Sequence, residues 1–98
     1  MAKLEIDSSQ LEQYKSLLKE EIEMAVRSEP GVLTLYAVYE TKHPTRVTVF
    51  EVYADQWAYE SRLQTSHFKK YKTGTQKMVK HLELIVVTPI ALQAKNQG

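Results

Sequence analysis

The sequence has 98 residues, of which 43% are hydrophobic and 26% charged, with a formal net charge of +1 and no cysteine. This length favours a single domain, and the charge balance gives no electrostatic reason to expect nucleic acid or an anionic membrane as partner. The lack of cysteine excludes disulfides and thiolate metal sites. Because no apolar run approaches the ~20 residues of a membrane span and no signal-peptide pattern is present, we expect a cytoplasmic protein.

The first part of the chain is predicted to form a strand followed by a helix. Leu4 and Ile6 alternate with charged residues, which predicts a half-buried strand. Ser9 and Glu12 have the spacing of a capping box, which predicts a helix start. The apolar side of this helix is Leu11, Tyr14, Leu18, Ile22 and Ala25. Glu29-Pro30-Gly31 ends the helix, because proline cannot continue its hydrogen bonds.

Two strands and a divided helix follow. Val32–Glu40 and Arg46–Tyr53 are rich in β-branched and aromatic residues, and five polar residues join them, which predicts a hairpin. Asp55 and Ser66 are candidate N-caps, so the second helical region is expected in two pieces. Leu82–Thr88 has the pattern of a last strand.

The order β-α-β-β-α-β predicts an α+β, ferredoxin-like fold with a four-stranded antiparallel sheet. We place the domain at residues 1–89 and a C-terminal tail at 90–98. In the third strand Val47 and Val49 point to one face and Phe50 and Val52 to the other, so both sheet faces are apolar. The helices cover one face. A second copy covering the other would remove a large exposed apolar surface, which predicts a homodimer.

Candidate chemical groups are few. The three histidines, His43, His67 and His81, have no metal-ligand spacing, so we predict no metal site. His67 begins a helix beside Phe68, where a structural and a functional role both stay open. Glu51 lies inside an apolar strand, where its carboxylate is either paired with a cation or is a polar group in a pocket. Five aromatic residues fall on elements that should meet between helices and sheet: Tyr36, Tyr53, Tyr59, Phe68 and Tyr71. Such a stripe is more often part of the core, but buried tyrosine hydroxyls need partners, and a small polar-lined cavity would supply them. Tyr36, Tyr53, Phe68 and Tyr71 are the candidate substrate-binding residues.

The absence of two motifs narrows the chemistry. The sequence has no glycine-rich phosphate loop and no G-x-S-x-G elbow. Nucleotide-dependent reactions and acyl transfer through a serine are therefore not expected. A reaction here would depend on acid–base groups and on the reactivity of the substrate.

Four motifs resemble one known family. They are Glu29-Pro30-Gly31, Pro44-Thr45-Arg46, Glu51-Val52-Tyr53-Ala54-Asp55 and Ser66-His67-Phe68-Lys69, in this order. Together they resemble the antibiotic biosynthesis monooxygenase family, in particular its small bacterial proteins described as quinol monooxygenases. The resemblance implies a dimeric α/β barrel with a pocket between sheet and helices in each subunit.

The resemblance also implies a site and an activity. Tyr53 would line the pocket, Glu51 and His67 would be the catalytic polar groups, and Phe68 and Tyr71 its walls. The implied activity is a cofactor-independent monooxygenase that oxidises a quinol or related phenol with O2. Haem-degrading members have an asparagine in the first strand and a tryptophan at the position of Tyr53, and neither is present here.

The implied mechanism needs neither flavin nor metal. A base accepts the phenolic proton, because a phenolate donates electrons to O2 more readily than a phenol, and an apolar pocket contains the intermediates. Two alternatives stay open: an isomerase of a small phosphorylated carbonyl compound, and a non-catalytic dimeric ligand-binding or stress-response module.

Overall fold

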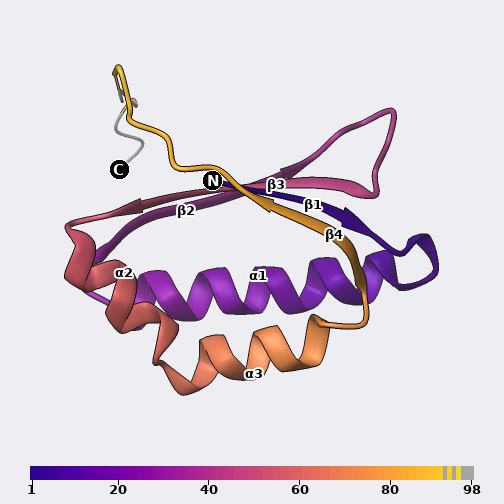
Figure 1. The fold of residues 1–98 in the computed structure, drawn as a ribbon, viewed down its shortest axis with the longest axis horizontal. Helices are drawn as coiled ribbons and strands as arrows, with labels where there is room; N and C mark the ends of the chain where they lie inside the picture. Colours follow the sequence, from indigo (N-terminus) through magenta and orange to yellow (C-terminus); the bar gives the residue numbers. More distant parts are fainter. Residues whose placement is uncertain (92, 94, 96–98) are drawn as a thin grey trace.

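The computed structural model describes residues 1–91, 93 and 95 and confirms the expected order of elements (Figure 1). In chain order they are β1 (Ala2–Ile6), the 3-10 helix η1 (Ser8–Gln10), α1 (Leu11–Ser28), β2 (Val32–Tyr39), β3 (Arg46–Tyr53), α2 (Gln56–Leu63), α3 (Ser66–Thr75) and β4 (Val79–Leu84). The sheet has the strand order β2-β3-β1-β4 with antiparallel neighbours. This is the predicted ferredoxin-like α+β fold, with the second helical region divided into α2 and α3.

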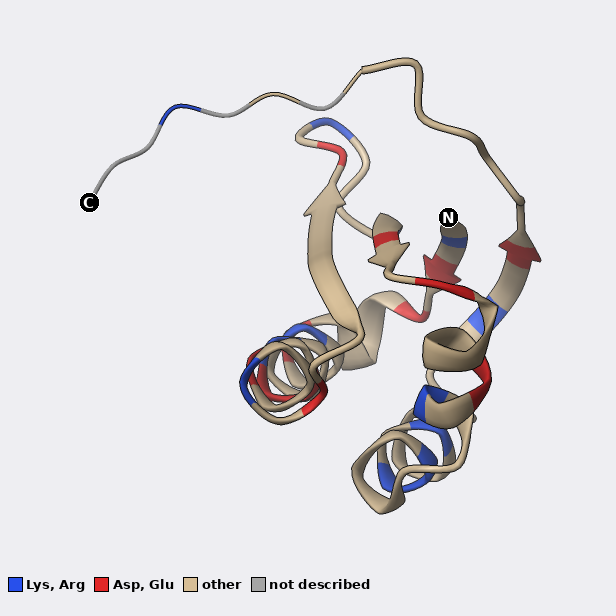
Figure 2. Ribbon diagram, turned by 90° about the vertical axis from the view of Figure 1, so that its left-hand side faces the viewer, with Lys and Arg blue, Asp and Glu red and all other residues tan. Residues whose placement is uncertain are grey.

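The helices lie on one face of the sheet, and the core lies between the two layers (Figures 1 and 2). The main buried cluster joins β1, α1, β3 and the chain before β4, and Tyr14 and Ile6 are its most enclosed large side chains. A smaller cluster of Ala25, Val32 and Leu35 packs the end of α1 against β2. No helix in the described part of the chain has the length and apolar character that a membrane crossing requires.

The helix starts differ from the predicted caps in two of three cases. Asp55 caps α2 as expected, because its side chain accepts from the backbone N–H of Ala58 at 2.8 Å. The capping box of Ser9 is wrong, since Ser9 lies within η1 and the cap there is Asp7. Thr65, not Ser66, caps α3. A cap must precede the first helical residue to reach the free amides.

The last strand also differs from its prediction, because β4 spans Val79–Leu84 and not Leu82–Thr88. Leu84 pairs with Ala2, and the next residue, Ile85, exchanges backbone hydrogen bonds with Met1 at 2.8 and 2.9 Å. The paired part of the last strand therefore begins three residues earlier than the sequence pattern predicts.

The face of the sheet away from the helices is apolar over β2 and β3 and charged over β1. On β2 and β3, Tyr36, Val38 and Phe50 point outward and are 59%, 38% and 40% exposed. On β1, Lys3 and Glu5 take the outward positions between buried neighbours. The expected second apolar face is therefore present on half of the sheet.

Candidate functional site

Four ionisable side chains converge where α1, α2 and α3 meet, and we call them the charged cluster: Glu21, Glu29, Arg62 and His67. Glu21 follows Tyr14 and Leu18 at helical spacing, so it points from α1 toward the core. Glu29 caps the C-terminus of α1, and Arg62 and His67 come from the end of α2 and the start of α3. Glu21 and Arg62 are each only 4% exposed.

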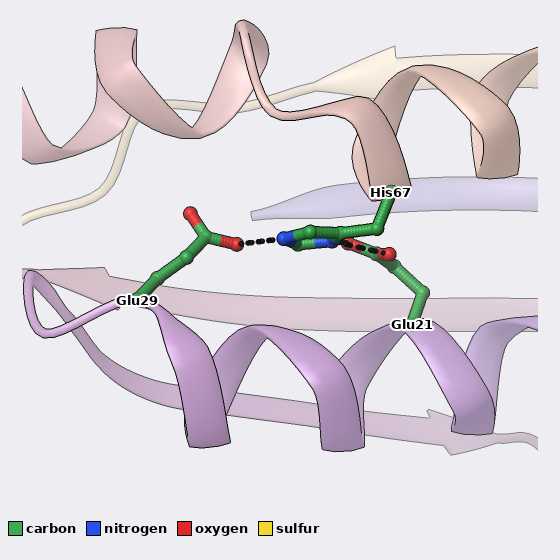
Figure 3. A group of neighbouring side chains, drawn as sticks. All are labelled: Glu21, Glu29 and His67. Carbon is green, nitrogen blue, oxygen red and sulfur yellow. Dashed lines mark hydrogen bonds and ion pairs between the residues drawn. The ribbon is translucent and has the colours of Figure 1, made fainter.

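The contacts within the charged cluster are short and shared. Arg62 Nη1 donates to Glu21 Oε2 at 3.0 Å and to Glu29 Oε2 at 2.9 Å. His67 Nδ1 lies 2.8 Å from Glu21 Oε1, and His67 Nε2 lies 3.1 Å from Glu29 Oε2. Figure 3 shows the imidazole ring of His67 between the two carboxylates. The imidazole therefore lies against both carboxylates, and Glu21 takes the hydrogen bond of Nδ1.

Glu51 and Tyr53 form a second pair on β3, on the side of the sheet that faces the helices. The Tyr53 hydroxyl donates to Glu51 Oε2 at 3.0 Å. Burial, and then the charge of Glu51, raise the pKa of Tyr53 above its usual range, while the nearby Arg62 opposes the rise. Tyr53 is therefore a neutral hydrogen-bond donor, and Arg62 connects this pair electrostatically with the charged cluster.

Phe68 and Tyr71 continue the site along α3. The Phe68 ring packs against the Arg62 guanidinium, with the guanidinium carbon 4.8 Å from the ring centroid. The Tyr71 hydroxyl lies 2.7 Å from the Tyr14 hydroxyl, and burial raises the pKa of both phenols. These two aromatic side chains therefore extend from the charged cluster toward the core.

The structure brings five of the six predicted site residues to the helix side of the sheet. His67, Phe68 and Tyr71 gather on α3, and Glu51 and Tyr53 on β3. The sixth, Tyr36, lies on the outward face of β2, with its ring 6.2 Å from that of Phe50. Within the described residues no hydrogen bond joins His67 to Glu51: the partner of Glu51 is Tyr53, and His67 lies against Glu21 and Glu29.

Sequence reasoning missed Glu21 and Arg62 and treated Glu29 only as part of a helix stop. A signal for Glu21 exists, because it follows Leu18 by three residues on the apolar side of α1. Arg62 likewise follows the buried Ala58 by four residues in α2. A charged residue at a core position of a helix indicates a buried partner of opposite charge.

The carboxylates and imidazole of the charged cluster also resemble a metal-ligand set, since one ligand atom from each of Glu21, Glu29 and His67 lies within 4.8 Å of the others. The arrangement is already filled, however. Arg62 Nη1 lies within hydrogen-bond distance of both carboxylates, at 3.0 and 2.9 Å, and the ring of His67 lies between Glu21 and Glu29. The donor set therefore serves an internal salt-bridge network.

Two surface hollows lie outside this site. One, of about 450 Å³, lies between α3 and β4, and another, of about 410 Å³, lies between α1 and β2. Tyr36 is among the residues lining the second hollow. Neither hollow is lined by Glu51, Tyr53 or His67.

A family model described as antibiotic biosynthesis monooxygenase matches residues 1–74. A candidate antibiotic biosynthesis monooxygenase from Bacteroides thetaiotaomicron is 52% identical over 98% of this chain and 91% of that one, with a TM-score of 0.91. A candidate monooxygenase from Lactobacillus acidophilus is 29% identical over 84% of this chain, with a TM-score of 0.82, and this chain spans only 39% of its length. A candidate antibiotic biosynthesis monooxygenase from Nitrosomonas europaea is 15% identical over 92% of this chain and 95% of that one, with a TM-score of 0.85, and shares the fold. No curated protein matches the sequence.

Proposed function

The chain belongs to the antibiotic biosynthesis monooxygenase family, and on this basis we propose that it is a cofactor-independent oxygenase of a quinol or related phenol. The observation that carries the proposal is the position of Glu51, Tyr53 and His67, which lie on the helix side of the sheet with aromatic neighbours. A quinol supplies its own reducing electrons: one O2 and one quinol give a hydroxyquinone and one water, so no external reductant is needed.

Glu51 is the proton acceptor in this proposal. Its Oε2 accepts the Tyr53 hydroxyl, and Oε1, which has no hydrogen bond within the described residues, is the oxygen that we assign to the substrate hydroxyl. Proton removal raises the electron density of the ring and favours transfer to O2. Tyr53 stays neutral because of its raised pKa and can orient the substrate oxygen by a hydrogen bond.

His67 is the second acid–base group in this proposal. Its two nitrogens are held by Glu21 and Glu29, which fixes the ring orientation at the start of α3. When a substrate displaces one of these carboxylate contacts, the ring nitrogen that it frees can transfer a proton to the reduced oxygen. Phe68 and Tyr71 supply apolar surface that limits the access of water to the intermediates.

The proposal is tested by oxygen uptake of metal-free protein with hydroquinones and naphthohydroquinones, after subtraction of autoxidation. E51Q and H67Q should each lower turnover by on the order of 10²-fold. Matched controls are E83Q and H43Q, which change the same residue types on β4 and in the exposed turn before β3. Wild-type turnover in E51Q and H67Q would refute the assignment of these two residues.

We propose in addition that the protein is a homodimer joined through the outward face of β2 and β3. The support is the exposed apolar set of Tyr36, Val38 and Phe50, which a second copy of the same face would cover. F50E should convert a dimer to a monomer in light scattering after size exclusion, whereas K3E on the charged half should not. A monomeric wild-type protein at micromolar concentration would refute this.

Two further functions are separated by the same assays. An isomerase of a phosphorylated carbonyl compound needs a free cation at the site, and Arg62 is occupied by Glu21 and Glu29. A non-catalytic module would bind quinols without oxygen uptake. Saturable uptake that depends on Glu51 therefore favours the oxygenase over both.

A further inference from the structure

The positive charge of this protein is concentrated on one side, although the net charge is only +1. Residues 66–82 contain five lysines and no acidic residue, so the rest of the chain is net negative. This segment forms α3 and most of β4. In Figure 2, α3 carries blue basic residues and no red acidic residue, whereas α1 carries residues of both charges.

The α3–β4 hollow lies within this basic segment. It has a volume of about 450 Å³, within the ~300–1,000 Å³ that small-molecule sites occupy. Its lining residues are Lys72, Thr73, Thr75, Gln76, Val79, Lys80, His81 and Leu82. The lining therefore combines two lysines, several hydrogen-bonding side chains and two aliphatic residues, and it contains no carboxylate.

The lysines of the α3–β4 hollow are not neutralised by neighbours. Lys72 and Lys80 take part in no ion pair among residues 1–91, 93 and 95. The charge of Lys80 contributes to the lowered pKa of Asp7, but it is the weakest of the causes. The carboxylate of Asp7 accepts its hydrogen bonds from Ser9. By contrast, Lys15 at the α1–β2 hollow is paired with Glu12 at 3.1 Å and lies over the Tyr39 ring.

We propose that the α3–β4 hollow is a binding site for a small organic anion, with a flat apolar body and one carboxylate, sulfonate or phosphate group. Lys72 and Lys80 bind the charged group, and Val79 and Leu82 contact the apolar body. A compact hollow with aliphatic lining suits a small molecule, whereas nucleic acid requires a positive surface that follows a backbone. The site is separate from Glu51, Tyr53 and His67, so it goes beyond the proposed oxygenase activity.

The experiment uses a matched pair of probes and a matched pair of variants. The anion 2-naphthoate and its neutral counterpart 2-naphthamide are titrated into the full-length, isotope-labelled protein and followed by amide NMR shifts. K72Q/K80Q removes both charges of the α3–β4 hollow, and K15Q/K19Q removes two lysines of the α1–β2 hollow. All four changes are on the surface, and circular dichroism checks that each variant is folded.

We expect 2-naphthoate to bind saturably with the largest shifts in residues 72–82, and K72Q/K80Q to weaken it by about tenfold. K15Q/K19Q should leave its affinity unchanged, and 2-naphthamide should bind wild type about tenfold more weakly than 2-naphthoate. No saturable binding at millimolar probe, or equal affinity of both variants, would overturn the proposal. So would a DNA or RNA oligonucleotide that binds through Lys72 and Lys80 more tightly than the probe.

Discussion

Replacement of Arg62 should cost several kcal/mol of stability although it removes no core hydrophobic residue. Its side chain is 5% exposed and neutralises Glu21 and Glu29 at 3.0 and 2.9 Å. In R62M the apolar stem beside Phe68 is kept, but the buried carboxylate of Glu21 and the partly buried one of Glu29 lose their arginine partner. Because removal of one partner from a buried pair costs about 3–5 kcal/mol, we expect the free energy of unfolding to fall by about 3 kcal/mol. At a urea m-value of about 1.5 kcal/mol/M, the midpoint falls by about 2 M.

The exposed pair of Arg46 and Glu40 is the matched control. Their side chains are 55% and 57% exposed and 3.6 Å apart, so R46M should change the free energy of unfolding by less than about 1 kcal/mol. In the triple variant R62M/E21Q/E29Q the unpaired negative charges are gone, and much of the lost stability should return. Equal urea midpoints for R62M and R46M would refute the reasoning.

Two further predictions concern packing and burial. G31A should destabilise the protein by about 1–3 kcal/mol, because a Cβ at this position collides with the Cβ of Ala58. G74A in α3 should stabilise it by about 0.5–1 kcal/mol, because the added Cβ meets open space. Equal urea midpoints of the two variants would contradict this. The pKa of Tyr14 and Tyr71 is raised by burial, so their stabilising contribution is complete below about pH 10, the pKa of an unfolded tyrosine, and is lost as the pH rises above it. The free energy of unfolding, measured between about pH 8 and 11, should therefore fall less steeply in Y14F than in wild type, and parallel curves would exclude the effect.

The charged cluster links stability to the proposed chemistry. Glu21 and Glu29 hold His67 in place, and the same carboxylates hold Arg62. A change that disturbs Arg62 is therefore expected to reorient His67 as well as to weaken the packing of α1 on α3. For this reason oxygen uptake of R62M should be compared with that of H67Q only at urea concentrations where both are folded.

The elements of the fold could be predicted because their signals are local. Alternation in β1 and β3, the helical spacing of Tyr14 and Leu18, and the stop at Pro30 each depend on near neighbours in the chain. The end of β4 could not be predicted in this way. A strand continues only while a neighbouring strand supplies hydrogen bonds, and which residues of β4 pair with β1 depends on a register that forms between distant parts of the chain.

The same contrast between local signals and distant partners applies to the candidate site. The sequence by itself determined the family, a common sheet face for Glu51 and Tyr53, and the position of His67 at a helix start. Only the tertiary structure decided which groups meet: His67 with Glu21 and Glu29, Glu51 with Tyr53, and Tyr36 with neither. The physical reason is that a buried charge must find a partner through space. The partners of Arg62, Glu21 and Glu29, are 41 and 33 residues away in the chain, beyond the range of any local sequence pattern.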